Sequence, residues 1–146
     1  MPRFTLGLGP FGAVVDAFVT VSVERGAALQ KAGQPIPNAV RVRALIDTGA
    51  SCSCVDSSVI KELSIPPTGR EKVHTASTGQ EAPHEANQYD VGMVIPSGTQ
   101  APLYLPNLPV VEAELEHLGY KALIGRDVLA RCILVYDGSG FFTLGY

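Results

Sequence analysis

The chemistry in this sequence is concentrated at Asp47, Thr48 and Gly49, which directly follow the apolar run Ala44-Leu45-Ile46. That run predicts a buried strand ending in an acid, and an ionised carboxylate there is costly unless neighbouring donors hold its charge. The next residues supply such donors, because Thr48 carries a hydroxyl and Gly49 lets backbone N–H groups approach the carboxylate. A carboxylate held in this way is suited to general acid–base chemistry.

Two stretches of the sequence resemble one known family. Asp47-Thr48-Gly49-Ala50-Ser51 resembles the active-site loop of aspartic proteases, where Asp-Thr-Gly is followed by Ala or Ser. Leu123-Ile124-Gly125-Arg126-Asp127 resembles the apolar-apolar-Gly element of the retropepsins, which packs against that loop and continues into a short helix. The order of these elements is the family's, and the resemblance covers most of residues 39–146. It implies an all-β, closed-barrel-like retropepsin (acid protease) fold with one or two short helices.

The resemblance also implies a role for each residue of the loop. Asp47 is the catalytic acid that holds and activates a water molecule, Thr48 hydrogen-bonds across a dimer axis, and Gly49 brings the backbone close to carboxylate and substrate. Ala50 and Ser51 begin the substrate groove. These roles define the loop as the expected catalytic centre.

Residues outside the loop are assigned in the same way. The small, polar stretch 77–86 is expected to be either a mobile hairpin tip (a flap) or an ordinary surface loop; as a flap, its Ser77, Thr78 and Gly79 close over the peptide. In the second element, Ile124 and Gly125 support the loop, and Arg126 pairs with an acid near the groove or interface. In viral relatives this acid follows the motif, whereas the equivalent position here is Ser51. Asp127 is expected to be a helix N-terminal acid rather than a catalyst.

The aspartic-protease mechanism needs two carboxylates that share one proton, so that one acts as base and the other as acid. Asp-Thr-Gly occurs once in this chain, and Asp137-Gly138-Ser139-Gly140 lacks the threonine and is typical of a tight hairpin turn. The second carboxylate is therefore expected from a second copy of the chain, with a twofold axis placing Asp47 against its mate. We expect a homodimeric endopeptidase with a mildly acidic optimum and no cofactor, acting on an extended peptide or protein substrate.

A second interpretation stays open. The same fold serves in principle as a catalytically silent retropepsin-like module that dimerises or binds a peptide without cleaving it. The intact Asp-Thr-Gly favours the enzyme, since a binding module has no need of two carboxylates held together.

The composition narrows the class of protein. The 146 residues fit one domain, predicted as an N-terminal arm over 1–14, expected to be flexible, and a protease domain over 15–146. A net charge of −3 argues against nucleic-acid and anionic-membrane partners, and the uncharged run near the N-terminus is shorter than the ~18 residues of a membrane span. The cysteines, Cys52, Cys54 and Cys132, are expected to be free thiols in a cytoplasmic protein, and no metal site is predicted.

Hydrophobic periodicity predicts the elements that carry these residues. Alternation over 15–24 indicates a strand, so the preceding Gly-x-Gly-x-x-Gly pattern at 7–12 lacks the strand–helix context of a dinucleotide site. A loop is expected over 25–38, and the two prolines in the strand 103–114 indicate a sheet edge. The other predictions are strands at 39–46, 52–55, 70–76 and 87–95, helices at 59–63 and after Gly125, and a closing hairpin over 133–144.

Overall fold

The computed structural model describes residues 1–74 and 83–146, and half of the described residues lie in strands. The elements, in chain order, are β1 (Arg3–Gly7), β2 (Val14–Val21), α1 (Val23–Lys31), β3 (Val40–Ile46), β4 (Cys54–Asp56), α2 (Ser57–Glu62), β5 (Gly69–Val73), β6 (His84–Ser97), β7 (Gln100–Ala113), η1 (Glu116–Leu118), β8 (Ala122–Ile124), α3 (Arg126–Leu129), β9 (Ile133–Asp137) and β10 (Phe141–Gly145).

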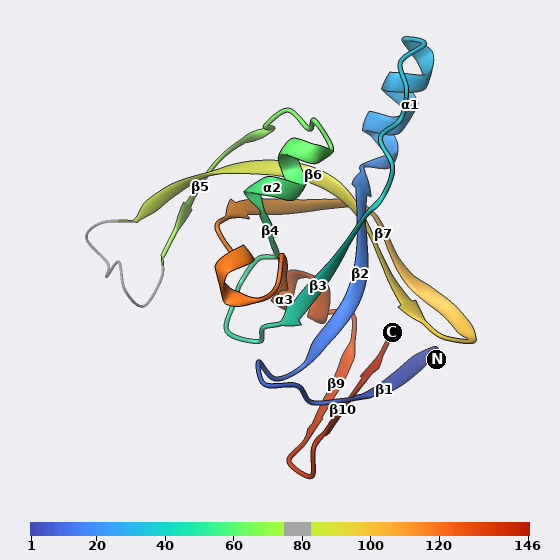
Figure 1. The fold of residues 1–146 in the computed structure, drawn as a ribbon, viewed down its shortest axis with the longest axis vertical. Coiled ribbons are helices and arrows are strands. Elements are labelled where there is room, and N and C mark those ends of the chain that lie inside the picture. The colour runs from blue at the N-terminus through green and yellow to red at the C-terminus, as the bar shows by residue number, and fades with distance from the viewer. Residues whose placement is uncertain (75–82) are drawn as a thin grey trace.

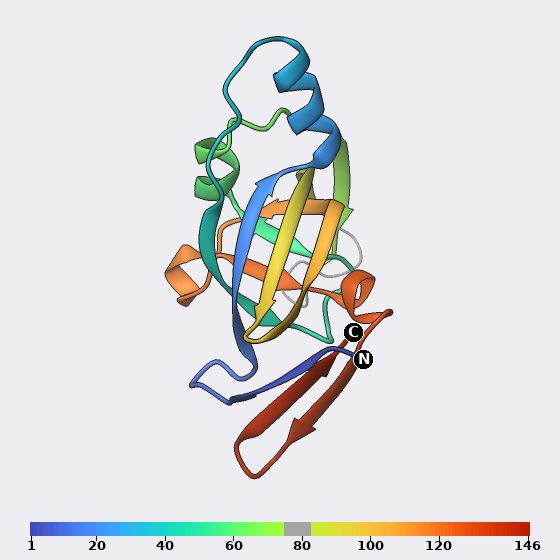
Figure 2. The same cartoon turned by 90° about the vertical axis from the view of Figure 1, so that its right-hand side faces the viewer.

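A closed barrel forms the centre of the molecule (Figures 1 and 2). Its six strands follow the order β2-β3-β8-β4-β7-β6, and β6 pairs back onto β2 to close the ring. The long β6 makes this possible because its first part pairs with β5 and its later residues, 91–94, pair with β2. Helix α1 projects from one end of the barrel, and a smaller sheet of β1, β10 and β9 lies at the other. The all-β, barrel-like prediction is confirmed.

The core follows the predicted alternation of apolar residues. In β2, Val15, Ala17, Val19 and Val21 are buried, while Asp16 between them is exposed. The smaller sheet contributes its buried residues 142 and 144 to the same hydrophobic cluster, so one core supports both sheets.

The N-terminal residues are more ordered than the sequence suggested. Residues 3–7 were expected within a flexible arm, but they form β1 and pair along their whole length with β10 near the C-terminus. Phe4 packs edge-on against Phe142 with ring centroids 6.4 Å apart. The expectation of flexibility is therefore wrong for residues 3–7, because a strand and an aromatic contact hold them.

The loop expected over 25–38 is also wrong in its first half, where the chain forms α1. The side chain of Ser22 caps this helix by accepting a hydrogen bond from the backbone N–H of Arg25 at 3.1 Å. Glu24 in the first turn and Lys31 in the last complement the helix dipole. The helix buries no residue, so capping, charge placement and helix-forming residues stabilise it instead of a packed face.

Prolines in β7 mark an edge over part of that strand. Pro106 and Pro109 lie where β7 pairs with β6 alone, because β4 joins β7 only at residues 111–113. The predicted edge is confirmed beside the prolines and is wrong at the end of the strand, which is inside the sheet.

Asp56 fixes the start of α2, close to the predicted helix. One carboxylate oxygen accepts hydrogen bonds from the Ser58 N–H at 2.9 Å and hydroxyl at 2.7 Å. The other accepts from the backbone N–H groups of Leu115 at 2.7 Å and Glu116 at 2.8 Å. Burial alone raises the pKa of the Asp56 carboxyl, but these hydrogen bonds outweigh burial and lower its pKa to about 2.

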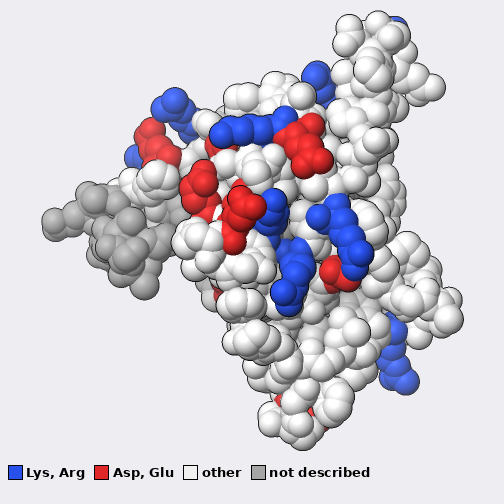
Figure 3. All heavy atoms as spheres, in the orientation of Figure 1, with Lys and Arg blue, Asp and Glu red and all other residues white. Residues whose placement is uncertain are grey.

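The surface in view in Figure 3 carries charges of both signs close together. Arg41 and Asp16 form an ion pair at 2.7 Å, and Lys121 pairs with Glu116 at 3.2 Å. No helix in the described part of the chain combines the length and the apolar character needed to cross a bilayer.

Candidate active site

The Asp47 loop begins where β3 leaves the barrel. β3 runs parallel to β8, and the backbone N–H of Asp47 continues this ladder by donating to the Ile124 carbonyl at 2.9 Å. The Gly49 N–H then donates to the carboxylate Oδ1 of Asp47 at 2.8 Å, and the Ala50 N–H donates to the Asp47 carbonyl at 3.2 Å. The buried strand and the sheet ladder thus fix the backbone of Asp47, and the turn fixes its carboxylate.

The Asp47 loop is partly exposed to solvent. Asp47 is half-buried, whereas Thr48 and Gly49 are exposed. The Thr48 side chain lies at the surface of the loop. A Cβ at Gly49 would lie 3.1 Å from the Asp47 Oδ1, which leaves little room for a side chain there.

The backbone of Gly125 lies in close contact with the backbone of the loop. A Cβ on this residue would lie 2.6 Å from the carbonyl carbon of Cys52 and 3.1 Å from the carbonyl oxygen of Ala50. The N–H of Arg126 donates to that same Ala50 carbonyl at 2.9 Å. Gly125 has an extended backbone, so the sequence requires glycine here for space and not for conformation.

A second contact between the loop and α3 was not foreseen from the sequence. Ser53 is fully buried, and both its N–H and its hydroxyl donate to Asp127, at 2.9 Å and 2.8 Å. The Ser53 hydroxyl oxygen in turn accepts from the Gly125 N–H at 3.0 Å, and Asp127 also accepts from the N–H of Val128 at 2.9 Å. Asp127 therefore lies at the helix start, as predicted, and also ties α3 to the loop.

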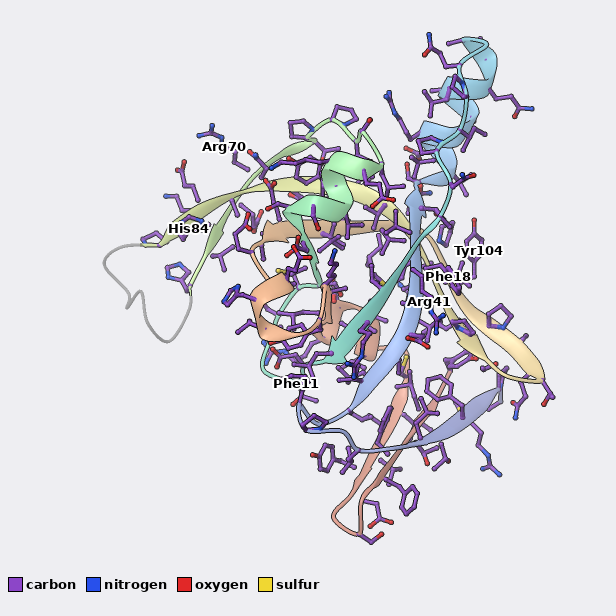
Figure 4. All side chains as sticks on the ribbon, viewed as in Figure 1. Phe11, Phe18, Arg41, Arg70, His84 and Tyr104 are labelled. Carbon is purple, nitrogen blue, oxygen red and sulfur yellow. The ribbon has the colours of Figure 1, made fainter. Side chains whose placement is uncertain are left out.

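The segment before β2 is hydrogen-bonded to the end of β3, next to the loop. The Ala13 carbonyl accepts from the Ile46 N–H at 2.9 Å, directly before Asp47. Phe11, labelled in Figure 4, packs edge-on against Tyr120 with ring centroids 5.9 Å apart. A Cβ on Gly119 would lie 2.8 Å from the Phe11 ring, so this contact also depends on a glycine.

Arg126 lies beside the loop without the expected acidic partner. It is exposed, and its guanidinium approaches the Thr48 carbonyl at 3.5 Å. Among the described residues, no carboxylate forms an ion pair with Arg126.

The thiols near the loop are protonated. Cys52, Cys54 and Cys132 are free and half-buried. Burial, followed by the neighbouring Cys52 and Asp127, raises the pKa of Cys54 to about 12, and burial raises the pKa of Cys52 as well. In the described part of the chain, no group of His, Cys, Asp and Glu is arranged to hold a metal ion.

A cavity of about 470 Å³ opens beside the loop and is lined in part by Ser51, β5, β7 and α3. Arg70 and His84 mark the hairpin of β5 and β6 next to it (Figure 4), whose strands pair from 69–73 to 84–88. The predicted substrate contacts Ser77, Thr78 and Gly79 lie outside the described residues. The structure thus brings Asp47, Gly49, Ala50, Ile124 and Gly125 together.

Comparisons with known proteins agree with this arrangement. Residues 36–128 match the sequence profile of a family described as aspartyl protease. Among solved structures, the chain is similar to a retropepsin-like aspartic protease from Rickettsia conorii, with a TM-score of 0.60 and 18% sequence identity. That alignment covers 99% of this chain and 90% of the other, and it confirms the predicted retropepsin-like fold. A search of curated proteins found no match.

Proposed function

The chain belongs to the aspartyl protease family, and on this premise we propose that it is an endopeptidase whose catalytic group is Asp47. The observation that carries the proposal is the position of this carboxylate at the exposed end of a buried strand, held by the Gly49 N–H at 2.8 Å. A preorganised, half-exposed carboxylate in this fold is suited to holding a water molecule next to a bound peptide.

The proposed reaction uses two such carboxylates. One Asp47, ionised, takes a proton from the water as it attacks the scissile carbonyl, while the other, protonated, donates to the carbonyl oxygen. Like charges a few ångströms apart do not both ionise, so a close pair holds one proton between them at mildly acidic pH. No metal or cofactor takes part in this scheme.

We propose that the second carboxylate comes from a second copy of the chain. The other Asp-Gly stretch, at Asp137, is the turn of the β9–β10 hairpin. There the Asp137 Oδ1 accepts from the Ser139 N–H at 2.8 Å. The exposed Thr48 hydroxyl is available to its counterpart across a twofold axis that passes beside Asp47.

The smaller sheet offers a surface for this dimer. Ile133, Val135 and Phe141 share one face of it and are 56%, 52% and 53% exposed. Along the chain, β9 begins a few residues after α3, whose Arg126 N–H donates to the Ala50 carbonyl of the loop. Apolar side chains gathered on one exposed face are typical of a protein interface.

The remaining predictions extend the proposal. Ser77, Thr78 and Gly79 stay predicted substrate contacts, since the β5–β6 hairpin that carries them borders the cavity beside the loop. The free, protonated cysteines fit the expected reducing, cytoplasmic setting.

The experiment that tests the function is cleavage of a diverse peptide library between pH 3 and 7 by the wild type and by Asp47→Asn. We expect cleavage that a statine-type transition-state analogue inhibits and that the variant lacks, while Asp137→Asn cleaves normally. Equal cleavage by Asp47→Asn would contradict the proposal. A folded wild type that binds peptides and cleaves none would favour the silent peptide-binding module.

A further inference from the structure

The glycine pattern at residues 7–12 has no part in the proposed reaction, yet it forms a defined turn. Gly9 and Gly12 face each other, and the N–H of each donates to the carbonyl of the other at 3.0 Å. Gly12 has a φ of +101°, in the left-handed region that favours glycine. Pro10 and Phe11 form the tip of this turn, where the fixed φ of proline suits the first position. The turn therefore gives the Phe11 backbone a defined position.

Both ends of this turn are fixed to the rest of the protein. The Leu8 N–H donates to the Gly140 carbonyl of the β9–β10 turn at 2.8 Å, and the Leu8 side chain packs against the core. At the other end, Ala13 is buried, and its carbonyl accepts from the Ile46 N–H at 2.9 Å. Ile46 directly precedes Asp47, so the turn leads into a segment bonded to the last residue of β3.

The Phe11 ring connects the segments on the two sides of β3. In the barrel, β3 lies between β2 and β8. Phe11, shortly before β2, packs against Tyr120, shortly before β8, with ring centroids 5.9 Å apart. The ring also lies over Gly119, where a Cβ would be 2.8 Å from the Phe11 Cζ. Next along the chain, the Lys121 N–H donates to the Arg43 carbonyl at 2.9 Å, where the β3–β8 ladder begins.

Burial in the core does not account for this aromatic contact. Phe11 is 46% exposed, and both rings lie outside the hydrophobic cluster that forms the core. The contact does bear on Asp47, whose N–H donates to the Ile124 carbonyl of β8 at 2.9 Å, while Ile46 is bonded on the β2 side. A link between these two neighbours of β3 therefore restricts the residue between them.

We propose that Phe11 is a positioning residue for Asp47. Its ring, packed on Gly119 and Tyr120, keeps the end of β3 held between its two neighbours and so limits the movement of the Asp47 backbone and carboxylate. Its effect on catalysis rests on the proposed function, whereas its effect on the position of the loop does not. Displacing a catalytic group by about 1 Å costs on the order of 100-fold in rate, so a contact outside the site is sufficient to alter kcat.

Amide hydrogen exchange tests the position of the loop without any measurement of activity. In Phe11→Ala, we expect the N–H groups of Ile46 and Asp47 to exchange at least ~10-fold faster than in the wild type, because the end of β3 opens locally more often. The N–H of Val91, inside the barrel, should exchange as before. The matched control is Tyr104→Ala, which removes another exposed ring and should change none of these rates. Unchanged exchange at Ile46 and Asp47, or an equal increase at all three amides, would overturn the proposal.

A double-mutant cycle assigns the effect to the contact between the two rings. Tyr120→Ala should also accelerate exchange at Ile46 and Asp47, and the double variant should exchange little faster than either single variant, because each change removes the same contact. Fully additive effects would contradict a shared contact. Phe11→Leu, which also lacks the ring, takes the place of Phe11→Ala if that variant does not fold.

Peptide cleavage then separates positioning from binding. Phe11→Ala should lower kcat about 10-fold while KM stays within about twofold, since the substrate still binds and the catalytic group is less well placed. Wild-type kcat, or a change in KM alone, would overturn the positioning role. If the wild type cleaves no peptide, the proposed function fails, and hydrogen exchange still decides whether Phe11 holds the loop.

Discussion

Ser53 and Asp127 join the segment after the Asp47 loop to α3 across a separation of 74 residues, through two hydrogen bonds of 2.9 Å and 2.8 Å. Gly125, directly before α3, donates to the same serine hydroxyl at 3.0 Å. The segment that follows the Asp47 loop and the start of α3 thus share one polar cluster around the buried Ser53. Because buried polar groups are costly when unpaired, this cluster defines a single position for the loop.

Replacing Ser53 by Ala should damage both stability and catalysis. The change removes the hydroxyl and leaves the Gly125 N–H and one Asp127 oxygen without that partner, which costs about 1–3 kcal/mol in the free energy of unfolding. Denaturant unfolding measures the loss of stability. The values of kcat and KM, measured at a temperature where the variant is folded, show whether the loop has moved. Ser139→Ala, in the exposed β9–β10 turn, is the control. An active, fully stable Ser53→Ala would show that the cluster does not position the loop.

Gly125→Ala should displace the loop directly. Its new methyl group would lie 2.6 Å from the Cys52 carbonyl carbon, so the backbone must move. Overpacking of this kind costs about 1–3 kcal/mol, and we expect a larger loss in kcat than in peptide binding. The matched control is Gly138→Ala, where a Cβ would meet no atom within 4 Å. Wild-type kcat in Gly125→Ala would contradict the close-contact role.

Asp56 should govern stability in acid. Its pKa in the folded protein is about 2, below the ordinary value of 3.8, so the charged form is stabilised. That contribution, about 2 kcal/mol, is present above pH ~4 and is lost as the pH falls through ~2. In Asp56→Asn the free energy of unfolding should be lower at pH 5 and should change less between pH 4 and pH 2. Chemical unfolding at several pH values measures this, with the exposed Asp137→Asn as the comparison, and equal acid profiles for Asp56→Asn and the wild type would contradict it.

Phe141→Glu should weaken the proposed dimer. The substitution places a charge on the apolar face formed with Ile133 and Val135, and a central aromatic contact is typically worth 1–2 kcal/mol or more. We expect the dissociation constant to rise at least ~10-fold in analytical ultracentrifugation. Tyr104→Glu, at a residue 53% exposed on β7, should leave it unchanged. The same dissociation constant in both variants would place the interface elsewhere.

The sequence predicted the elements whose signals are local. Alternating valines indicated β2, the apolar run before Asp47 indicated β3, and the apolar-apolar-Gly element located β8 and α3. Helix α1 was missed because Gly26 and the later prolines were taken as signals of a loop. They outweighed two helix signals, the cap at Ser22 and the helix-forming residues that follow it.

The rest depended on contacts between distant parts of the chain. β1 pairs with β10, more than a hundred residues away, and nothing in residues 3–7 identifies that partner. The role of Ser53 was missed for the same reason. Its position between Cys52 and Cys54 in a predicted strand was the one local signal that its side chain is buried. The pairing of Asp127 with Ser53 could not follow from helix signals alone.

The measurement that tests the central claim most directly is activity in mixtures of wild-type and Asp47→Asn chains, unfolded together and refolded so that dimers form at random. If each active centre needs Asp47 from both chains, mixed dimers are inactive, and an equal mixture keeps about one quarter of the activity of the same total amount of wild type. If each chain acts alone, the equal mixture keeps about one half. A quadratic dependence on the wild-type fraction supports the shared pair, and a linear dependence would contradict it.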